Sequence, residues 1–181
     1  MENDITDLAS EIVMLNVLPI DKQLFEIIKF DTAWDNSMVS RKTVSYGILY
    51  NYSGQEYEFC NMPGYLDPLL SFVNDQIGFM PNNCLINYYV DGKSKMGFHS
   101  DQTDQLAAGT GIVIVSLGNA RVIRFRSKAD KKNTVDFTLD AGTLFYMSQE
   151  VQEHWMHAVL PDKDNLENDR ISLTFRKLTD S

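Results

Sequence analysis

A histidine and an aspartate in the middle of the chain could together bind a metal ion. His99 and Asp101 are two positions apart, and side chains at i and i+2 of an extended segment point to the same side. One imidazole and one carboxylate are two of the three ligands in the two-histidine, one-carboxylate sites that hold ferrous iron. A surface turn with two solvated polar side chains is the alternative interpretation of this triplet.

The sequence offers two further histidines for the third ligand. His154 and His157 lie on either side of Trp155 and Met156, and His157 is our first choice, with His154 as the competing ligand. Three protein ligands would leave coordination positions of the metal open for other molecules, which metal-assisted chemistry requires.

A strand near the C-terminus could bind an anion beside that metal. Its positions alternate between a polar and an apolar face, with Arg170, Ser172, Thr174 and Arg176 on one side and Ile171, Leu173 and Phe175 on the other. Two guanidinium groups on one face could hold both ends of a short dianion, because their donors match carboxylates in geometry and charge. A surface strand with solvated arginines is the alternative. Asn87 and Tyr89 repeat the i, i+2 spacing on an earlier strand and add an amide and a phenol.

Composition and charge limit what the whole chain can be. At 181 residues it fits one domain. Its net charge of −9 argues against a protein that coats nucleic acid with its entire surface. Six cations between positions 121 and 132 could nevertheless form a phosphate-contacting ridge, or simply keep an exposed hairpin soluble: Arg121, Arg124, Arg126, Lys128, Lys131 and Lys132.

Two further features predict a soluble intracellular protein. Cys60 and Cys84 have neither zinc-site nor redox spacing, so we expect reduced thiols. The N-terminus lacks the basic start and apolar run of a secretory signal, and no segment approaches the roughly 18 apolar residues of a membrane span. We therefore expect a cytoplasmic protein, or a nuclear one in a eukaryote, that does not associate with membranes and is a monomer.

The elements that must position these residues follow from hydrophobic periodicity. Apolar residues at helical spacing predict helices over 21–30 and 66–79. Alternating aromatic and polar residues before a turn predict a strand over 49–54 that enters a hairpin. Further strands are predicted at 83–90, 111–117, 121–127, 133–139, 143–147, 154–160 and 170–177. This order indicates an α+β chain dominated by a closed or double-sheet β core of the jelly-roll kind.

Several motifs in the same order make the chain resemble the AlkB family, the Fe(II)- and 2-oxoglutarate-dependent dioxygenases that remove alkyl groups from nucleobases. The resemblance covers about residues 38–178 and is greatest to the animal homologues that act on duplex DNA. The motifs are residues 84–92 with Asn87 and Tyr89, 97–101 with His99 and Asp101, 115–118, Arg121, Phe125, 142–144, 154–157 and 170–176.

The resemblance implies a double-stranded β-helix, or jelly roll, with N-terminal helices packed on one sheet, and roles for named residues. Iron would be bound by His99, Asp101 and His157, which leaves His154 as a supporting or packing residue. For 2-oxoglutarate, Arg170 and Tyr89 would hold the distal carboxylate and Asn87 and Arg176 would lie at the chelating end, with Ser172 and Thr174 on the same face. A flipped base would be covered by the segment with Tyr46, Tyr50 and Tyr52, beside Arg41 and Thr103.

The implied activity is oxidative demethylation of N-alkylated bases, of the 1-methyladenine and 3-methylcytosine type, in DNA or RNA, with Fe(II), 2-oxoglutarate and O2. Thr103 stands where the family commonly has an acidic residue that contacts the damaged base. Together with the net charge, this suits an alternative in which the same chemistry acts on a small metabolite, a free nucleoside or a protein side chain. A binding module that retains the shape without turnover is a third hypothesis. Within a single domain we expect an N-terminal extension (1–37), a substrate lid (38–80) and a catalytic jelly roll (81–178).

Overall fold

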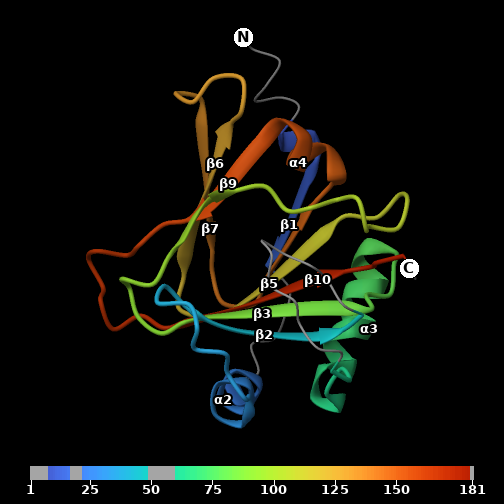
Figure 1. Cartoon of the computed structure of the whole chain (residues 1–181), viewed down its shortest axis with the longest axis vertical. Helices are drawn as coiled ribbons and strands as arrows, with labels where there is room; N and C mark the ends of the chain where they lie inside the picture. Colours follow the sequence, from blue (N-terminus) through green and yellow to red (C-terminus); the bar gives the residue numbers. More distant parts are fainter. Residues whose placement is uncertain (1–7, 17–21, 49–59, 180–181) are drawn as a thin grey trace.

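The computed structural model describes residues 8–16, 22–48 and 60–179. In this part of the chain, short strands dominate and the helices are few (Figure 1). In chain order the elements are β1 (Ile12–Asn16), α2 (Lys22–Asp31), β2 (Lys42–Gly47), η1 (Gly64–Leu66), α3 (Asp67–Ile77), β3 (Asn83–Tyr89), β4 (Met96–His99), β5 (Ile112–Gly118), β6 (Arg121–Ser127), β7 (Thr134–Leu139), β8 (Thr143–Met147), α4 (Gln149–His154), β9 (Trp155–Val159) and β10 (Arg170–Arg176).

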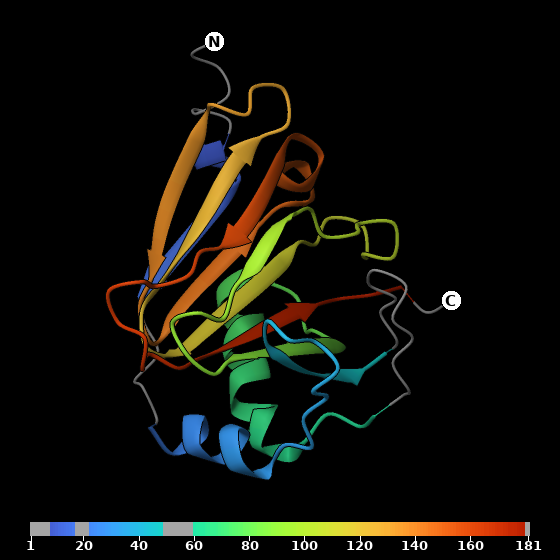
Figure 2. The same cartoon turned by 60° about the vertical axis from the view of Figure 1, so that its left-hand side comes forward.

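The strands form two antiparallel sheets. One sheet has six strands in the order β1-β8-β5-β10-β3-β2, and the other has four in the order β4-β9-β6-β7. Helices α2 and α3 lie on the side of the six-stranded sheet away from β6, β7 and β9 (Figures 1 and 2). The α+β jelly roll with helices on one sheet is therefore confirmed.

Because side chains alternate along the strands, the six-stranded sheet has apolar side chains on both faces. One face packs against the helices and the other packs toward the four-stranded sheet. Ile171, Leu173 and Phe175 of β10 belong to the buried cluster that also contains Ile28 of α2 and Val73 of α3. This cluster is the core between the helices and the sheet. Most of the apolar residues at helical spacing enter it from these two helices, whereas Ile27 of α2 is 36% exposed.

The opposite face of the same sheet packs toward the four-stranded sheet. Ile112 and Ile114 of β5 join Ile123 and Phe125 of β6 in a second buried cluster. Because neighbouring side chains of a strand point to opposite faces, Val113 lies instead in the core beneath the helices. The polar face of β10 points into the inter-sheet space, which places its arginines inside the molecule.

The two helices and the later strands agree with the sequence predictions to within three residues at each end. Five elements were not predicted: β1, β2, η1, β4 and α4. The strand β1 pairs with β8, with Ile12 opposite Met147, and the helix α4 is inserted between β8 and β9. A five-residue edge strand and a six-residue helix are each too short for periodicity to identify. The strand predicted at 49–54 lies outside the described residues.

The division into an extension, a lid and a catalytic jelly roll stays a prediction. Within 1–37, β1 is a strand of the six-stranded sheet and Ile28 of α2 lies in the core. In the region expected to be a lid, β2 is a sheet strand and α3 covers the outer face of that sheet. The expected thiols are both free, with Cys84 buried and Cys60 exposed. Among the described residues, no helix is long and apolar enough to cross a membrane.

Candidate functional site

Three potential metal ligands converge between the two sheets. β4 pairs with β9 so that His99 lies directly opposite His157, and the two ring centroids are 4.3 Å apart. Asp101 follows β4 by two residues, and its Oδ1 lies 3.5 Å from His99 Nε2. One ligand atom from each of the three residues lies within 4.8 Å of the others. This spacing suits binding to one ion.

Hydrogen bonding identifies which nitrogen of His99 faces the other ligands. His99 Nδ1 lies 2.9 Å from the carbonyl oxygen of Gly97. Since a carbonyl oxygen can only accept, Nδ1 carries the proton and donates it. Nε2, which faces Asp101, is therefore the nitrogen that has a lone pair to give to a metal.

Electrostatics keep the ligands in the protonation states that a metal needs. Burial alone would raise the pKa of Asp101, but the guanidinium of Arg176, followed by the two histidines, lowers it well below its usual range. Burial, with the neighbouring imidazole of His99 as a second cause, lowers the pKa of His157 to about 3. The carboxylate is thus ionised and the imidazole of His157 is neutral at pH 7, as metal binding requires.

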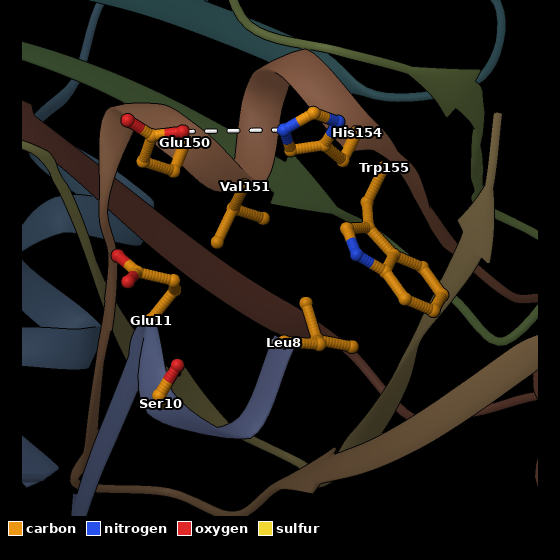
Figure 3. Close-up of a pocket in the computed structure, with 7 residues that line it drawn as sticks. All are labelled: Leu8, Ser10, Glu11, Glu150, Val151, His154 and Trp155. Carbon is orange, nitrogen blue, oxygen red and sulfur yellow. Dashed lines mark ion pairs between the residues drawn. The ribbon is translucent and has the colours of Figure 1, made fainter. Parts of the chain in front are cut away.

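The competing histidine lies elsewhere. The side chain of His154 is 70% exposed and faces Glu150 of its own helix, 4.0 Å away, beside a surface pocket (Figure 3). With Glu153 these residues form another group of possible ligands, but all three are exposed, and carboxylates and imidazoles at such positions are normally hydrated. Of the two candidates, His157 is the histidine that the fold brings to His99 and Asp101.

The polar face of β10 lies beside the three ligands and is buried. Arg176 Nη2 donates to Asp101 Oδ2 at 3.0 Å. Arg170 Nε donates to Ser116 Oγ at 2.8 Å, and its guanidinium lies 5.5 Å from the centroid of the Tyr89 ring. The alternative of a surface strand with solvated arginines is excluded, because Arg170 and Arg176 are 2% and 1% exposed.

The register of the sheet places the β3 side chains next to these arginines. Arg170 pairs with Tyr89, and Ser172 pairs with Asn87. Burial raises the pKa of Tyr89, so its hydroxyl keeps its proton and can donate. The resulting cavity is lined by Leu85, Asn87, Tyr89, Met96, His99, Asp101, Ile114, Ile123, His157, Val159, Arg170, Ser172, Thr174 and Arg176.

These residues fit a ferrous ion and a dicarboxylate. Two neutral imidazoles and one carboxylate are the ligand types that ferrous iron takes. Burial lowers the pKa of Arg170 to about 10, so it is still a cation at pH 7. Its Nη1 is buried and has no hydrogen-bond partner in the described part of the chain. A buried cation with an unused donor is costly unless an anion is bound there, and a carboxylate would satisfy it.

Not every residue expected to contact a substrate reaches this cavity. Tyr46 belongs to the core beneath the helices, on the face of β2 away from the site, because it pairs with Cys84 and not with a cavity-lining residue. Arg41 is buried and donates from Nε to Asn87 Oδ1 at 2.7 Å. Thr103 is partly exposed and is not among the lining residues. Tyr50 and Tyr52 lie outside the described residues.

Most of the basic cluster has a structural role. Arg121 is buried and donates to the carbonyl oxygens of Asp91, Ser94 and Leu160. Arg124 forms a two-point ion pair with Asp136. The remaining early members are also engaged, since the Arg126 guanidinium stacks 3.8 Å from the ring centroid of Phe98 and Lys128 donates to the Gln152 carbonyl. These cations therefore do not form a continuous phosphate-contacting ridge. Lys131 and Lys132 are the exposed members of the cluster.

Sequence reasoning missed several residues in or beside the cavity, among them Ser116 and Met96. Ser116 accepts the Arg170 bond, and it is the one hydroxyl in the otherwise apolar strand Ile112–Gly118. A polar residue in a buried strand is a usable signal, because such a group must find a partner. Met96 lies 3.9 Å from the Tyr89 hydroxyl, and nothing in its local sequence indicates that contact.

Comparison with known proteins gives a consistent result. Residues 27–176 match the family described as the 2OG-Fe(II) oxygenase superfamily. The chain is 32% identical over 154 residues to the DNA oxidative demethylase ALKBH2 of Bos taurus, covering 77% of this chain and 54% of that protein. It is 29% identical over 148 residues to protein R406 of Acanthamoeba polyphaga mimivirus, covering 82% and 72%. The solved structure of OsALKBH1 superposes with a TM-score of 0.64 at 17% identity over 92% of this chain and 98% of that one, which concerns the fold alone.

Proposed function

Because this chain belongs to the 2OG-Fe(II) oxygenase superfamily, we propose that it is an oxidative demethylase of N-alkylated nucleobases in DNA or RNA. The chain is an AlkB-like dioxygenase that uses Fe(II), 2-oxoglutarate and O2. It spans about half the length of bovine ALKBH2, so the substrate is the part that we propose. The observation that carries it is a two-histidine, one-carboxylate set, with Asp101 and His157 buried, beside an arginine face, in a chain similar to a DNA oxidative demethylase.

The proposed roles follow from the contacts. His99, Asp101 and His157 hold the iron, and the bond from Arg176 to Asp101 fixes the carboxylate. Arg170 and Tyr89 take the distal carboxylate of 2-oxoglutarate, because they form the buried end of the cavity that has an unused cationic donor. Asn87, Ser172 and Thr174 line the wall between these two groups.

Within this arrangement the protein binds the metal and 2-oxoglutarate, orients the substrate and excludes water. When bound, iron with 2-oxoglutarate and O2 supplies the oxidation that hydroxylates an N-methyl group, after which formaldehyde leaves. The ionised Asp101 and neutral His157 need no proton transfer before the metal binds. His99 is the most exposed of the three ligands, with 16% of its side chain accessible against 5% for Asp101. The substrate therefore approaches from the side of His99.

A second candidate keeps the chemistry and changes the substrate. The net charge is −9, and the four cations from Arg121 to Lys128 are engaged within the protein. Both observations weaken the electrostatic attraction to a phosphate backbone. They favour a free nucleoside, another small metabolite or a protein side chain over long nucleic acid.

One screen separates the two candidates. Single- and double-stranded oligonucleotides that carry 1-methyladenine or 3-methylcytosine, and the matching free nucleosides, are incubated with protein, Fe(II), ascorbate and 2-oxoglutarate. Loss of 14 mass units from an oligonucleotide, with one formaldehyde per event, supports the demethylase. Turnover of the nucleosides alone favours the second candidate. Formaldehyde release that is unchanged in Asp101→Ala would overturn the assigned iron site.

A further inference from the structure

The proposed carboxylate ligand Asp101 lies beyond the end of β4, where the backbone no longer pairs with a neighbouring strand. The pairing of β4 with β9 includes Met96 and His99 and does not continue to Asp101. On the opposite side, β9 begins only at Trp155, because the preceding residues form α4. A buried N–H group in this position must find another acceptor.

Two side-chain bonds replace the missing strand pairing. Ser100 Oγ donates to the carbonyl oxygen of Trp155 at 2.9 Å. The backbone N–H of Asp101 donates to Gln152 Oε1, also at 2.9 Å and in a buried position. The second bond connects the main chain of a metal ligand to a helix 51 residues further along the chain.

Gln152 is itself held firmly enough to fix its partner. The residue is 4% exposed, and its Nε2 lies 3.6 Å from Met147 Sδ. Its backbone carbonyl accepts a bond from Lys128 Nζ at 2.7 Å. Val151 of α4 and Trp155 at the start of β9 lie close to Leu8, while Glu150 and His154 are at the surface (Figure 3). Of the α4 side chains that the structure describes, Gln152 accepts the bond from Asp101.

We propose that Gln152 is a positioning residue for the iron site, and this inference rests on the assignment of Asp101 as an iron ligand in the proposed function. Arg176 fixes the carboxylate end of Asp101, and Gln152 fixes the main-chain end. With both ends fixed, Asp101 is held ready for the metal, and less conformational freedom is lost on binding. A neutral amide does this without placing a further charge next to the metal.

The test is a metal titration that needs neither substrate nor turnover. Co(II), a spectroscopic substitute for Fe(II), is titrated into the full chain, and its visible absorption bands report both affinity and coordination geometry. In Gln152→Leu the acceptor is lost, and the Co(II) Kd should rise about tenfold or more with altered bands. Gln152→Asn, which keeps a buried amide but does not reach Asp101, should weaken binding in the same direction. Gln152→Glu restores an acceptor at the same reach and should recover most of the affinity.

Gln149→Leu is the matched control. Gln149 lies on the same helix, and its Nε2 donates to the carbonyl oxygens of Ala107 and Thr110, away from the metal ligands. Its removal should lower the Tm of the metal-free protein as Gln152→Leu does, but leave the Co(II) Kd and bands unchanged. If Gln152→Leu and Gln152→Asn both bind Co(II) as the Gln149→Leu protein does, the inference is overturned. No methylated oligonucleotide takes part, so a missing demethylase activity would refute the proposed substrate and leave this inference standing.

Discussion

Replacing Arg170 with methionine should stabilise the ligand-free protein and at the same time remove its affinity for 2-oxoglutarate. Burial lowers the pKa of this arginine from 12.5 to about 10. Both values lie above 7, so the residue is charged in the folded and the unfolded chain. At about 1.4 kcal/mol per pKa unit, the folded state then carries a cost of about 3 kcal/mol for that charge.

The net change in stability follows from the interactions of Arg170 that methionine would remove. Arg170→Met removes the charge cost but also the bond to Ser116 Oγ, which contributes about 1.5–3 kcal/mol because its donor is charged. The metal-free, ligand-free protein should therefore be more stable by up to about 2 kcal/mol. Binding of 2-oxoglutarate would lose two bonds to a charged donor, each contributing about 1.5–3 kcal/mol, so its Kd should rise by at least about a hundredfold.

Two measurements check this opposite pair of effects. Urea unfolding of the metal-free protein gives the stability, and calorimetry of 2-oxoglutarate with the Mn(II)-loaded protein gives the affinity without turnover. Arg124→Met is the control, because the ion pair of Arg124 with Asp136 is solvent-exposed, at 39% and 42%, and should change either quantity by less than about 1 kcal/mol. An Arg170→Met protein that is less stable than wild type and still binds 2-oxoglutarate normally would refute the reasoning.

Three further predictions concern pH, packing and salt. The pKa of His157 is about 3 against a usual 6.5, so between those pH values only the unfolded chain binds a proton at this residue. The free energy of unfolding of the metal-free protein should therefore fall as the pH drops through that range, by up to about 1.4 kcal/mol per pH unit. His157→Gln should remove this part of the pH dependence in urea titrations. Arg121→Met would leave three carbonyl oxygens without their donor, so unfolding should become easier by about 3 kcal/mol with the salt dependence of any oligonucleotide binding unchanged. Replacing Lys131 and Lys132 with alanine should leave stability within about 0.5 kcal/mol; if the exposed hairpin contacts phosphate, the plot of log K against log salt should become shallower by about one to two, and an unchanged slope would exclude such contact.

The sequence alone determined much of this protein because the informative patterns are local. A period of two along Arg170–Arg176 separates apolar from polar residues, and a helical period identifies α2 and α3. The i, i+2 spacing of His99 and Asp101 already placed two candidate metal ligands on one side. The jelly roll followed from the succession of short strands, and ordered motifs identified the family.

Tertiary structure decided which of these residues meet. The resemblance to the AlkB family favoured His157 over His154, and the pairing of His99 with His157 brings it to the site, whereas His154 ends a surface helix. The polar face of β10 could have been solvated, and only the second sheet, packed over it, makes its arginines buried cations that need an anion. Because side chains alternate along β2, Tyr46 lies in the core beneath the helices. Arginines of the basic cluster bind other groups of the protein. Register and layer packing depend on contacts between residues far apart in the chain, and for that physical reason no local pattern could predict them.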